Sequence, residues 1–305
     1  MDFQLSYINQ GIRSDPEGFL AEWDGVYEAR VAQAAETLAA GLGQSPVVLL
    51  SGPSGSGKTT TAGKLQAALG RLGVACHTVS LDDYFRNIGG RDYPRTADGS
   101  LDLESPYCLD LELLNQHFDQ LERGEEILVP SFSFSRHMRD TSQVRPLRAG
   151  KDEAIIFEGI HALNDLITDR HPHAQRLYIS ARSGVAHQDD VLVKSTWTRL
   201  LRRCVRDFNY RGTDAVETLG LWANVRLGEK LHISPFKDKA QIQLDTSLAY
   251  EVSVLMAYAV PLLNALPEDA PRRDEILTML ENLRFFEPVD AALVSEASLL
   301  QEFIR

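Results

Sequence analysis

The 305-residue chain has few cysteines and no long apolar stretch. Its three cysteines, Cys76, Cys108 and Cys204, are widely spaced, which fits neither a disulfide framework nor a paired-cysteine metal site, so we expect free, buried thiols. No apolar run approaches the roughly 18 residues that a membrane span requires, and the first residues lack the basic and apolar parts of a signal peptide. The sequence therefore predicts a soluble cytoplasmic protein with no membrane partner.

Basic residues are in the minority, with 31 Lys and Arg against 43 Asp and Glu. The formal charge of −12 argues against a protein that binds nucleic acid over its whole surface. The segment 194–211 is the exception, because it holds six basic residues and one acid. This local charge of +5 within a total of −12 leaves −17 for the rest of the chain.

Alternating strand and helix patterns predict the fold class. Apolar runs rich in β-branched residues predict strands at 46–52, 74–81, 153–157 and 176–180. Apolar spacings of three and four predict helices at 16–41, 110–122, 162–169, 194–208, from 247 up to Pro261, and from 272 onward. We expect an α/β fold whose parallel sheet carries helices on both faces. Its predicted parts are an N-terminal helical extension (1–45), a core (46–246) and a C-terminal helical region packed on the core (247–305).

Residues 52–59, GPSGSGKT, match the phosphate-loop pattern G-x-x-x-x-G-K-[ST] between a predicted strand and a predicted helix. In such a loop, glycines let backbone N–H groups surround a phosphate chain at a helix N-terminus. Lys58 would neutralise phosphate oxygens, and the Thr59 hydroxyl would bind Mg²⁺. The spacing is not G-x-G-x-x-G, which disfavours a dinucleotide site. The predicted ATP-binding residues of this segment are Gly52, Ser54, Gly55, Ser56, Gly57, Lys58, Thr59 and Thr60.

Acidic residues follow two of the predicted strands. Asp82 and Asp83 come just after the strand at 74–81, and Glu158 ends the strand at 153–157. Strand carboxyl ends line the ligand crevice of a parallel sheet, so Asp82 could orient Mg²⁺ or take a proton from an acceptor hydroxyl. The alternative is a turn or helix-cap aspartate. Glu158 would contact the metal or make a structural hydrogen bond.

An arginine stripe lies within the basic segment. Arg199, Arg202, Arg203 and Arg206 share one helical face, and the opposite face carries Trp197, Leu201, Cys204 and Phe208. Like charges on one face repel each other, so the stripe predicts a bound anion, and in a phosphate-loop protein that anion is a polyphosphate. The alternatives are a solvated face paired with acids elsewhere, and a nucleic-acid patch.

The segment 129–139, VPSFSFSRHMR, alternates in polarity and places Phe132 and Phe134 on one side of a predicted strand. Arg136, His137 and Arg139 follow it. Aromatic side chains beside a few polar groups suit a nucleobase or another flat ligand. The alternative is a hairpin whose aromatic side chains pack into the core.

Taken in order, these motifs resemble the uridine kinase and phosphoribulokinase family of P-loop small-molecule kinases over about residues 46–245. The matching motifs are GPSGSGKTT, SLDDYFR, ESPYCLD, VPSFSFSRHMR, IIFEGIHAL and TRLLRRCVRDFNYRG. The tail SLLQEFIR (298–305) resembles the ending of longer bacterial uridine kinase-like proteins. The resemblance implies a P-loop NTPase-type sheet, a substrate β-hairpin near 127–148 and an arginine lid helix that closes over ATP.

The resemblance also implies roles for individual residues. The implied catalytic residues are Asp82, Lys58 and Arg206, and the Asp82 carboxylate would act as the general base. The implied metal residues are Thr59, Asp82 and Glu158, and the implied lid contacts to ATP are Arg206 and Arg211. The implied substrate-binding residues are Phe85, Glu104, Phe132, Phe134, His137 and Arg203. Mg²⁺ and ATP are the implied cofactor and phosphoryl donor.

Three residues depart from the family pattern, at two places in the chain. Phe132-Ser133 replaces a Tyr-Asp pair, and Thr213 replaces an arginine that often follows the lid Arg-Gly. We expect an Mg²⁺-dependent kinase that phosphorylates a primary hydroxyl, foremost the 5′-OH of uridine or a related nucleoside. The alternatives are a kinase for another small alcohol (a sugar, pantothenate-like or ribulose-phosphate-like acceptor) and a nucleotide-binding regulator with little turnover. The expected partner is a small molecule and not nucleic acid, and a homo-oligomer stays open.

Overall fold

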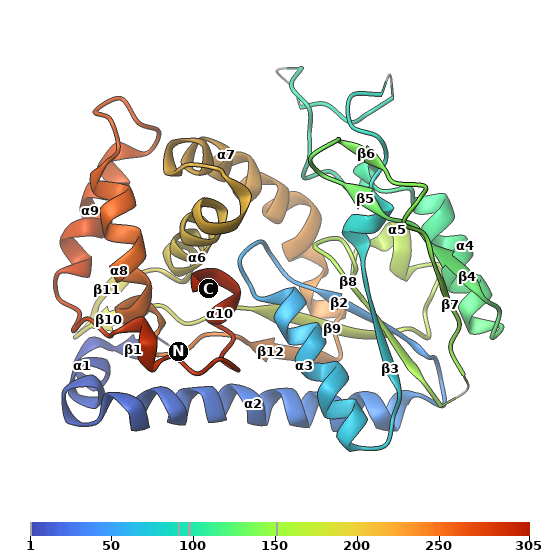
Figure 1. Ribbon diagram of the computed structural model, residues 1–305, viewed down its shortest axis with the longest axis horizontal. Coiled ribbons are helices and arrows are strands. Elements are labelled where there is room, and N and C mark those ends of the chain that lie inside the picture. Colours follow the sequence, from blue (N-terminus) through green and yellow to red (C-terminus); the bar gives the residue numbers. More distant parts are fainter. Residues whose placement is uncertain (1, 91, 97–98, 151) are drawn as a thin grey trace.

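The computed structural model describes residues 2–90, 92–96, 99–150 and 152–305. In this part of the chain, five strands form a parallel sheet in the order β12–β9–β2–β8–β3 (Figure 1). Their bounds are Val47–Ser51 (β2), Cys76–Ser80 (β3), Ala154–Glu158 (β8), Gln175–Ser180 (β9) and Ile242–Asp245 (β12). The predicted α/β fold with a parallel sheet is confirmed.

Helices cover both faces of this sheet. Their bounds are Pro16–Gly41 (α2), Lys58–Arg71 (α3), Leu111–Glu122 (α4) and Asp165–Thr168 (α5). Because side chains alternate along a strand, β2 supplies both faces. Val48 and Leu50 belong to a core shared with α2 and α3, and Val47 and Leu49 belong to a second core shared with α4 and α5. The continuous apolar run of β2 is therefore explained by burial on two sides.

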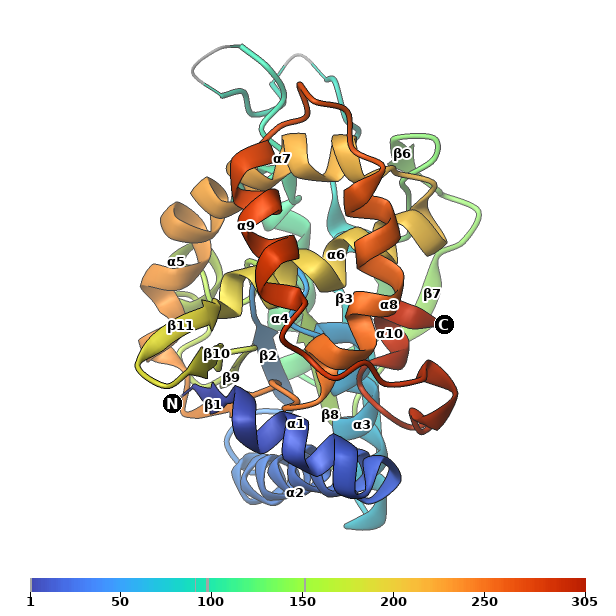
Figure 2. The same ribbon diagram turned by 90° about the vertical axis from the view of Figure 1, so that its left-hand side faces the viewer.

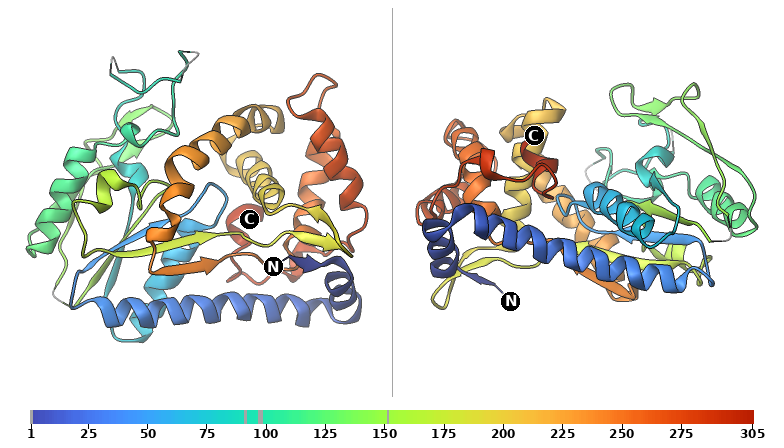
Figure 3. Two further views of the ribbon diagram at one scale, coloured as in Figure 1. Left: turned by 180° about the vertical axis from the view of Figure 1, so that it is seen from behind. Right: turned by 60° about the horizontal axis from the view of Figure 1, so that its bottom comes forward.

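The helix α2 runs along one side of the molecule, beneath the sheet (Figures 1 and 3). Its predicted bounds, 16–41, are those observed, and the Asp15 side chain caps it by accepting the Gly18 N–H at 3.0 Å. The preceding helix α1 (Leu5–Ser14) was not predicted. A small second sheet was also missed, since its strands are only two to four residues long. Its strands are Phe3–Gln4 (β1), Val185–His187 (β10) and Asp190–Val193 (β11).

Helices also fill the C-terminal part of the chain, where α8 and α9 stand beside α6 (Figure 2). The bounds are Ser195–Arg211 (α6), Ala215–Gly228 (α7), Glu251–Asn264 (α8), Arg273–Leu283 (α9) and Gln301–Ile304 (α10). Three of the predicted helices differ from the observed helices in their bounds. The helix α6 continues past residue 208, α5 is a single turn instead of 162–169, and α8 continues through Pro261 to Asn264. The turn after Pro261 is held by the buried Leu263, and the Ala265 N–H donates to the Pro261 carbonyl.

A hairpin occupies the predicted place between residues 127 and 148. Its strands are Ile127–Val129 (β4) with Arg145–Leu147 (β7), and Phe132–Ser133 (β5) with Met138–Arg139 (β6). Figure 1 shows it at the same side of the molecule as α4, with β5 and β6 above the sheet. The predicted strand that carries Phe132 and Phe134 is thus shorter than expected, because β5 ends at Ser133 and a turn leads from it to β6.

The cysteines are free, as expected, with Cys108 and Cys204 buried and Cys76 half-buried. Among the described residues, no helix combines the length and the apolar character that a membrane crossing requires. The division into three parts at residues 46 and 247 stays a prediction, as do the cellular location and the oligomeric state.

Candidate functional site

The phosphate-loop segment connects β2 to α3. Gly55 and Gly57 have positive φ values of 75° and 85°, which favour glycine. At Gly52, an added Cβ would lie 2.3 Å from the Ile179 carbonyl oxygen, so a side chain does not fit. The helix begins at Lys58, and its first N–H groups and the positive end of its dipole favour an anion there.

Lys58 lies among acidic side chains. Its Nζ atom donates to the Pro53 carbonyl at 3.3 Å. Burial lowers the pKa of Lys58, and the nearby carboxylates of Glu158 and Asp82 oppose that change. Beside it, the buried Ser56 hydroxyl has no hydrogen-bond partner within the described residues. A buried hydroxyl left unpaired is unfavourable, and this one is available to a ligand in the loop.

Two carboxylates, Asp82 and Glu158, lie at the carboxyl edge of the sheet, and one of them contacts Thr59. Asp82 lies in a short 3₁₀ helix after β3, where its N–H donates to the Ser80 Oγ at 3.3 Å. Glu158 is the last residue of β8 and is in register with Ser80. The Thr59 hydroxyl donates to Glu158 Oε1 at 3.3 Å. A hydroxyl and two carboxylates are oxygen ligands that fit a divalent cation such as Mg²⁺.

The electrostatics of Asp82 connect the sheet edge to the lid helix α6. The Asp82 side chain is accessible to solvent, but the protein around it raises its pKa. Lys58, Arg211 and Arg206 oppose this rise, so three cationic groups act on one carboxylate. A carboxylate with a raised pKa is a stronger base, as proton abstraction from a hydroxyl requires.

Three arginines at the end of α6 share a single acid. Asp207 pairs with Arg203 at 3.1 Å, with Arg206 at 3.0 Å and with Arg211 at 3.5 Å. One carboxylate leaves a positive surplus among them, and the neighbouring arginines together with burial lower the pKa of Arg211. This end of the helix therefore keeps a positive charge that suits an anion, and its role as an anion site stays a prediction.

The prediction that the whole arginine stripe binds an anion is wrong for its first two members. Arg199 is 3% exposed and pairs with Glu229 at 2.7 Å, while Arg202 is fully buried and pairs with Glu251 at 2.6 Å. Their guanidinium groups also donate to carbonyls of the phosphate loop, at 3.3 Å for Ser54 and 3.1 Å for Gly55. These two arginines support the loop from behind and are not free to bind a polyphosphate.

The apolar face of α6, opposite the arginine stripe, was predicted correctly except at one residue. Trp197, Leu201 and Cys204 are buried, but Phe208 is 51% exposed. The core reached by α6 ends before the last turn of the helix.

The predicted acceptor residues fall into two groups. Glu104 lies near Lys58 and Arg203, whose charges oppose the rise that burial causes in its pKa. It packs against Gly228, where an added Cβ would lie 2.4 Å from the Glu104 Cβ. Arg203 also donates to the Ser54 hydroxyl at 3.1 Å. A carboxylate and an arginine therefore stand together beside the phosphate loop.

Three phenylalanines form the second group. Phe85 lies 5.6 Å from Phe132 and 5.7 Å from Phe134, and those two lie 5.0 Å apart, measured between ring centroids. Phe132 is buried and Phe134 is 52% exposed, so one edge of the cluster is open. His137 stands in the exposed turn between β5 and β6 with a φ of 54°. The acceptor roles of these residues stay predictions.

The C-terminal segment supplies a contact that sequence reasoning missed. The Glu302 carboxylate accepts hydrogen bonds from the Thr60 N–H at 3.3 Å and from the Thr60 hydroxyl at 2.6 Å. In the same segment, Leu299 lies close to Gly57. A Cβ atom added at Gly57 would be 2.6 Å from the Leu299 Cδ1 atom. Figure 1 shows α10 between α6 and α3. The tail motif was visible in the sequence, but nothing local placed it at the phosphate loop.

His161 is a second missed residue. It is buried, its ring lies 6.2 Å from that of His232, and neither ring nitrogen has a hydrogen-bond partner among the described residues. Burial and His232 lower the pKa of His161 to about 3, so the ring is neutral at physiological pH. The signal in the sequence was its place three residues after Glu158.

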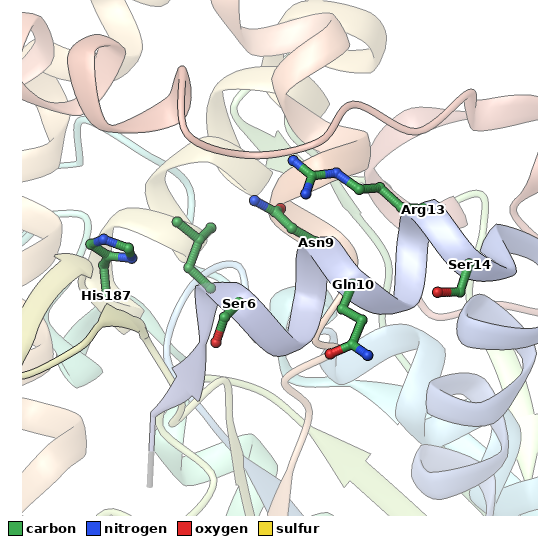
Figure 4. A pocket seen from close by; sticks show the side chains of 7 residues that line it. Ser6, Asn9, Gln10, Arg13, Ser14 and His187 are labelled. Carbon is green, nitrogen blue, oxygen red and sulfur yellow. The ribbon is translucent and has the colours of Figure 1, made fainter.

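A hollow beside α1 is separate from this site (Figure 4). The side chains that line it include Asn9, Arg13 and His187. Asn9 donates to the Phe285 carbonyl at 2.7 Å, and Arg13 pairs with Glu287. Its main polar groups are thus already bonded within the protein, and it contains none of the predicted site residues.

Comparison with known proteins agrees with this geometry. The model of the phosphoribulokinase / uridine kinase family matches residues 47–252. A uridine kinase of Schizosaccharomyces pombe is 31% identical over 170 residues, which are 56% of this chain and 33% of that protein. The matched region thus spans about a third of that relative. A uridine kinase of Halobacterium salinarum is 27% identical over 198 residues, which are 63% of this chain and 76% of that protein.

Among solved structures, a D-glycerate 3-kinase from Cryptococcus neoformans aligns with a TM-score of 0.48 and 15% identity, over 69% of this chain and 90% of that one. The family match covers the phosphate loop, the acids at the sheet edge, the hairpin and the lid helix. The resemblance read from the sequence is confirmed, and the chain belongs to the phosphoribulokinase / uridine kinase family of phosphotransferases that act on a hydroxyl group.

Proposed function

We propose that the chain transfers the γ-phosphoryl group of ATP, bound with Mg²⁺, to a hydroxyl of a small alcohol, foremost the 5′-OH of uridine or a related nucleoside. The observation that carries this proposal is the Asp82 carboxylate, which faces Lys58, Arg206 and Arg211 at the start of the phosphate-loop helix. A base and a group of cations directed at one point are what phosphoryl transfer requires.

Each residue has a distinct role in the proposal. Backbone N–H groups of the loop and Lys58 hold the phosphate chain. Thr59 and Glu158 would hold Mg²⁺, which supplies charge neutralisation between the phosphate oxygens when bound. Asp82 takes the proton of the acceptor hydroxyl as its oxygen attacks.

The surplus arginines of the lid helix stabilise the charge that spreads over the transferred group. Arg206 and Arg211 suit this role because, among the described residues, Asp207 is the one carboxylate that forms an ion pair with them. The acceptor would lie between the Glu104–Arg203 pair and the Phe85 cluster. A carboxylate can accept hydrogen bonds from sugar hydroxyls, and the open aromatic edge can cover a flat base.

A second acceptor class is favoured by Phe132 and Ser133. These residues replace a Tyr-Asp pair, so the phenol hydroxyl that would contact a pyrimidine is missing. Another small alcohol, such as a sugar or a pantothenate-like acceptor, needs no such contact. The phosphoryl-transfer residues serve either acceptor class equally.

A screen of acceptors with Mg-ATP tests the proposal. ADP release is measured for nucleosides, sugars and other small alcohols, with the wild-type chain, Asp82→Asn, and Asp83→Asn as the matched control. We expect one acceptor class to be phosphorylated, with turnover reduced about 10²- to 10⁴-fold in Asp82→Asn and retained in Asp83→Asn.

The other outcomes separate the alternatives. Faster turnover of a non-nucleoside would keep the kinase and remove the nucleoside. Tight ATP binding without phosphorylation of any acceptor, unchanged by Asp82→Asn, would reject the kinase in favour of a nucleotide-binding regulator.

A further inference from the structure

A second cluster of potential metal ligands lies outside the phosphate site. Asp119 and Glu122 project from one face of α4, and His171 lies in the segment that leads into β9. One ligand atom from each residue lies within 4.8 Å of the other two. The His171 Nδ1 atom is 3.9 Å from Asp119 Oδ1 and 3.8 Å from Glu122 Oε1. The phosphate loop contributes nothing to this cluster.

The hydrogen bonds of Asn115 determine which nitrogen of His171 is free. The Asn115 amide group donates to the Leu111 carbonyl at 2.7 Å and to the Leu166 carbonyl at 3.4 Å. Its Oδ1 atom is therefore the acceptor that lies 3.0 Å from His171 Nε2. The proton of the neutral ring is on Nε2, which leaves a lone pair on Nδ1.

This lone pair is buried and unused. The His171 side chain is 0% exposed, and its Nδ1 atom has no hydrogen-bond partner in the part of the chain that the structure describes. An unpaired buried acceptor directed at two carboxylates is unfavourable unless a cation lies between them.

The distances leave room for such a cation. The gaps of 3.8 and 3.9 Å are too long for hydrogen bonds. Ligands at about 2.0–2.2 Å from a tetrahedral ion stand about 3.4 Å apart, so a small rotation of the partly exposed carboxylates closes the site. Arg170 donates to the other Asp119 oxygen, Oδ2, at 3.3 Å. That contact holds the Asp119 carboxylate in place and leaves Oδ1 available to an ion.

We propose that Asp119, Glu122 and His171 bind a divalent transition-metal ion of the zinc class, with water completing its coordination. One imidazole and two carboxylates suit zinc better than Mg²⁺ or Ca²⁺, which prefer oxygen ligands alone. The ion would join α4 to the segment before β9. It would also replace the repulsion between the Asp119 and Glu122 carboxylates by attraction to a cation.

Zinc titration of the full chain tests this site. The protein is stripped with a chelator, placed in excess Mg²⁺ to compete at the oxygen ligands of the phosphate site, and titrated with ZnCl₂ by calorimetry. We expect one zinc per chain for the wild type, no zinc at this site for the double variant Asp119→Asn/Glu122→Gln, and one zinc for the control Glu112→Gln on the same helix. Zinc should also raise the melting temperature of the wild type and the control only.

Cobalt reports the imidazole ligand directly. The wild-type chain loaded with Co²⁺ should show visible absorption bands that change in His171→Ala. Because Asp119 and Glu122 are partly exposed, the double variant should fold even if His171→Ala does not. Zinc binding that is the same in the wild type and the double variant would overturn the proposal. So would a wild-type chain that binds no zinc, since His171 would then be an ordinary buried side chain.

Discussion

Both halves of α6 carry arginines, but the arginines of the two halves have different roles. In the first half, Arg199 and Arg202 are buried, and each pairs with a glutamate from another element. In the last turns, Arg203, Arg206 and Arg211 share Asp207. The first half is neutralised within the protein, and the second keeps a positive surplus for a ligand. A charged stripe in a sequence therefore does not by itself define a binding surface.

The difference arises from partners that are distant in the chain. Glu229 lies 30 residues after Arg199, and Glu251 lies 49 residues after Arg202. Both acids are brought to α6 by the packing of later elements. A neutral buried ion pair and a cluster with surplus positive charge should respond differently to substitution, and experiments can separate the two responses.

The largest expected effect is on turnover in the second half. Arg206→Gln should lower kcat about 10³-fold with the best acceptor, because the charge on the transferred group loses its arginine partner. The free energy of unfolding should change little, since Asp207 keeps two other arginines. Kinetics at saturating Mg-ATP and denaturant unfolding of the same sample measure both quantities. Normal turnover with lost stability would make Arg206 a structural residue.

Loss of an ion pair in the first half of α6 should lower the stability of the protein. Glu251→Gln leaves the fully buried Arg202 without a countercharge, which should lower the free energy of unfolding by about 3–5 kcal/mol. Urea or guanidinium unfolding measures this loss. Glu281→Gln, at a surface helix position, is the control and should have almost no effect. An unchanged unfolding midpoint in Glu251→Gln would contradict the assignment of Arg202 to loop support.

The site acids should make stability and activity respond oppositely to pH. Desolvation by the surrounding protein raises the folded-state pKa of Asp82, Glu104 and Glu158 above their unfolded values. The folded state therefore binds these protons more tightly, and the destabilisation from the charged forms is relieved as pH falls through the folded pKa values. Over the same range kcat/KM should fall, because protonated Asp82 cannot act as a base.

A substitution isolates the part due to Asp82. Asp82→Asn should raise the melting temperature of the ATP-free chain at neutral pH and reduce the gain in stability on acidification. Melting curves at several pH values check this. A lower melting temperature in Asp82→Asn, measured beside Asp83→Asn, would show that the charged carboxylate stabilises the fold.

The smallest effect is expected at the tail. The Glu302 carboxylate occupies the Thr60 N–H and hydroxyl, which a phosphate would otherwise use. Glu302→Gln should tighten ATP binding about 5-fold, equivalent to ~1 kcal/mol, because one negative charge near the phosphate chain is removed. Calorimetry measures the affinity, with the exposed Glu296→Gln as control. Weaker binding in Glu302→Gln would instead make the carboxylate a support of the site.

Sequence reasoning succeeded where the relevant residues are contiguous. The phosphate loop, the strands beside it, the acid that follows β3 and the acid that ends β8 are encoded within short segments, so their placement at one sheet edge follows from parallel pairing. The hairpin at 127–148 was expected from the family resemblance, and its two short strand pairs were not predicted.

The missed features depend on contacts between distant segments. The partners of Arg199 and Arg202, the contact of Glu302 with Thr60, and the pairing of β1 with β10 have no local pattern. The same is true of the Asp119, Glu122 and His171 cluster, whose members come from two elements.

The central claim is that the surplus charge at the end of α6 binds the polyphosphate. Inorganic tripolyphosphate tests this without any acceptor or nucleoside. Its affinity is compared by calorimetry between the wild type and Arg206→Gln/Arg211→Gln. Since a hydrogen bond to a charged group contributes about 1.5–3 kcal/mol, the double variant should bind at least about 10-fold more weakly. Equal affinity in the two proteins would contradict the account.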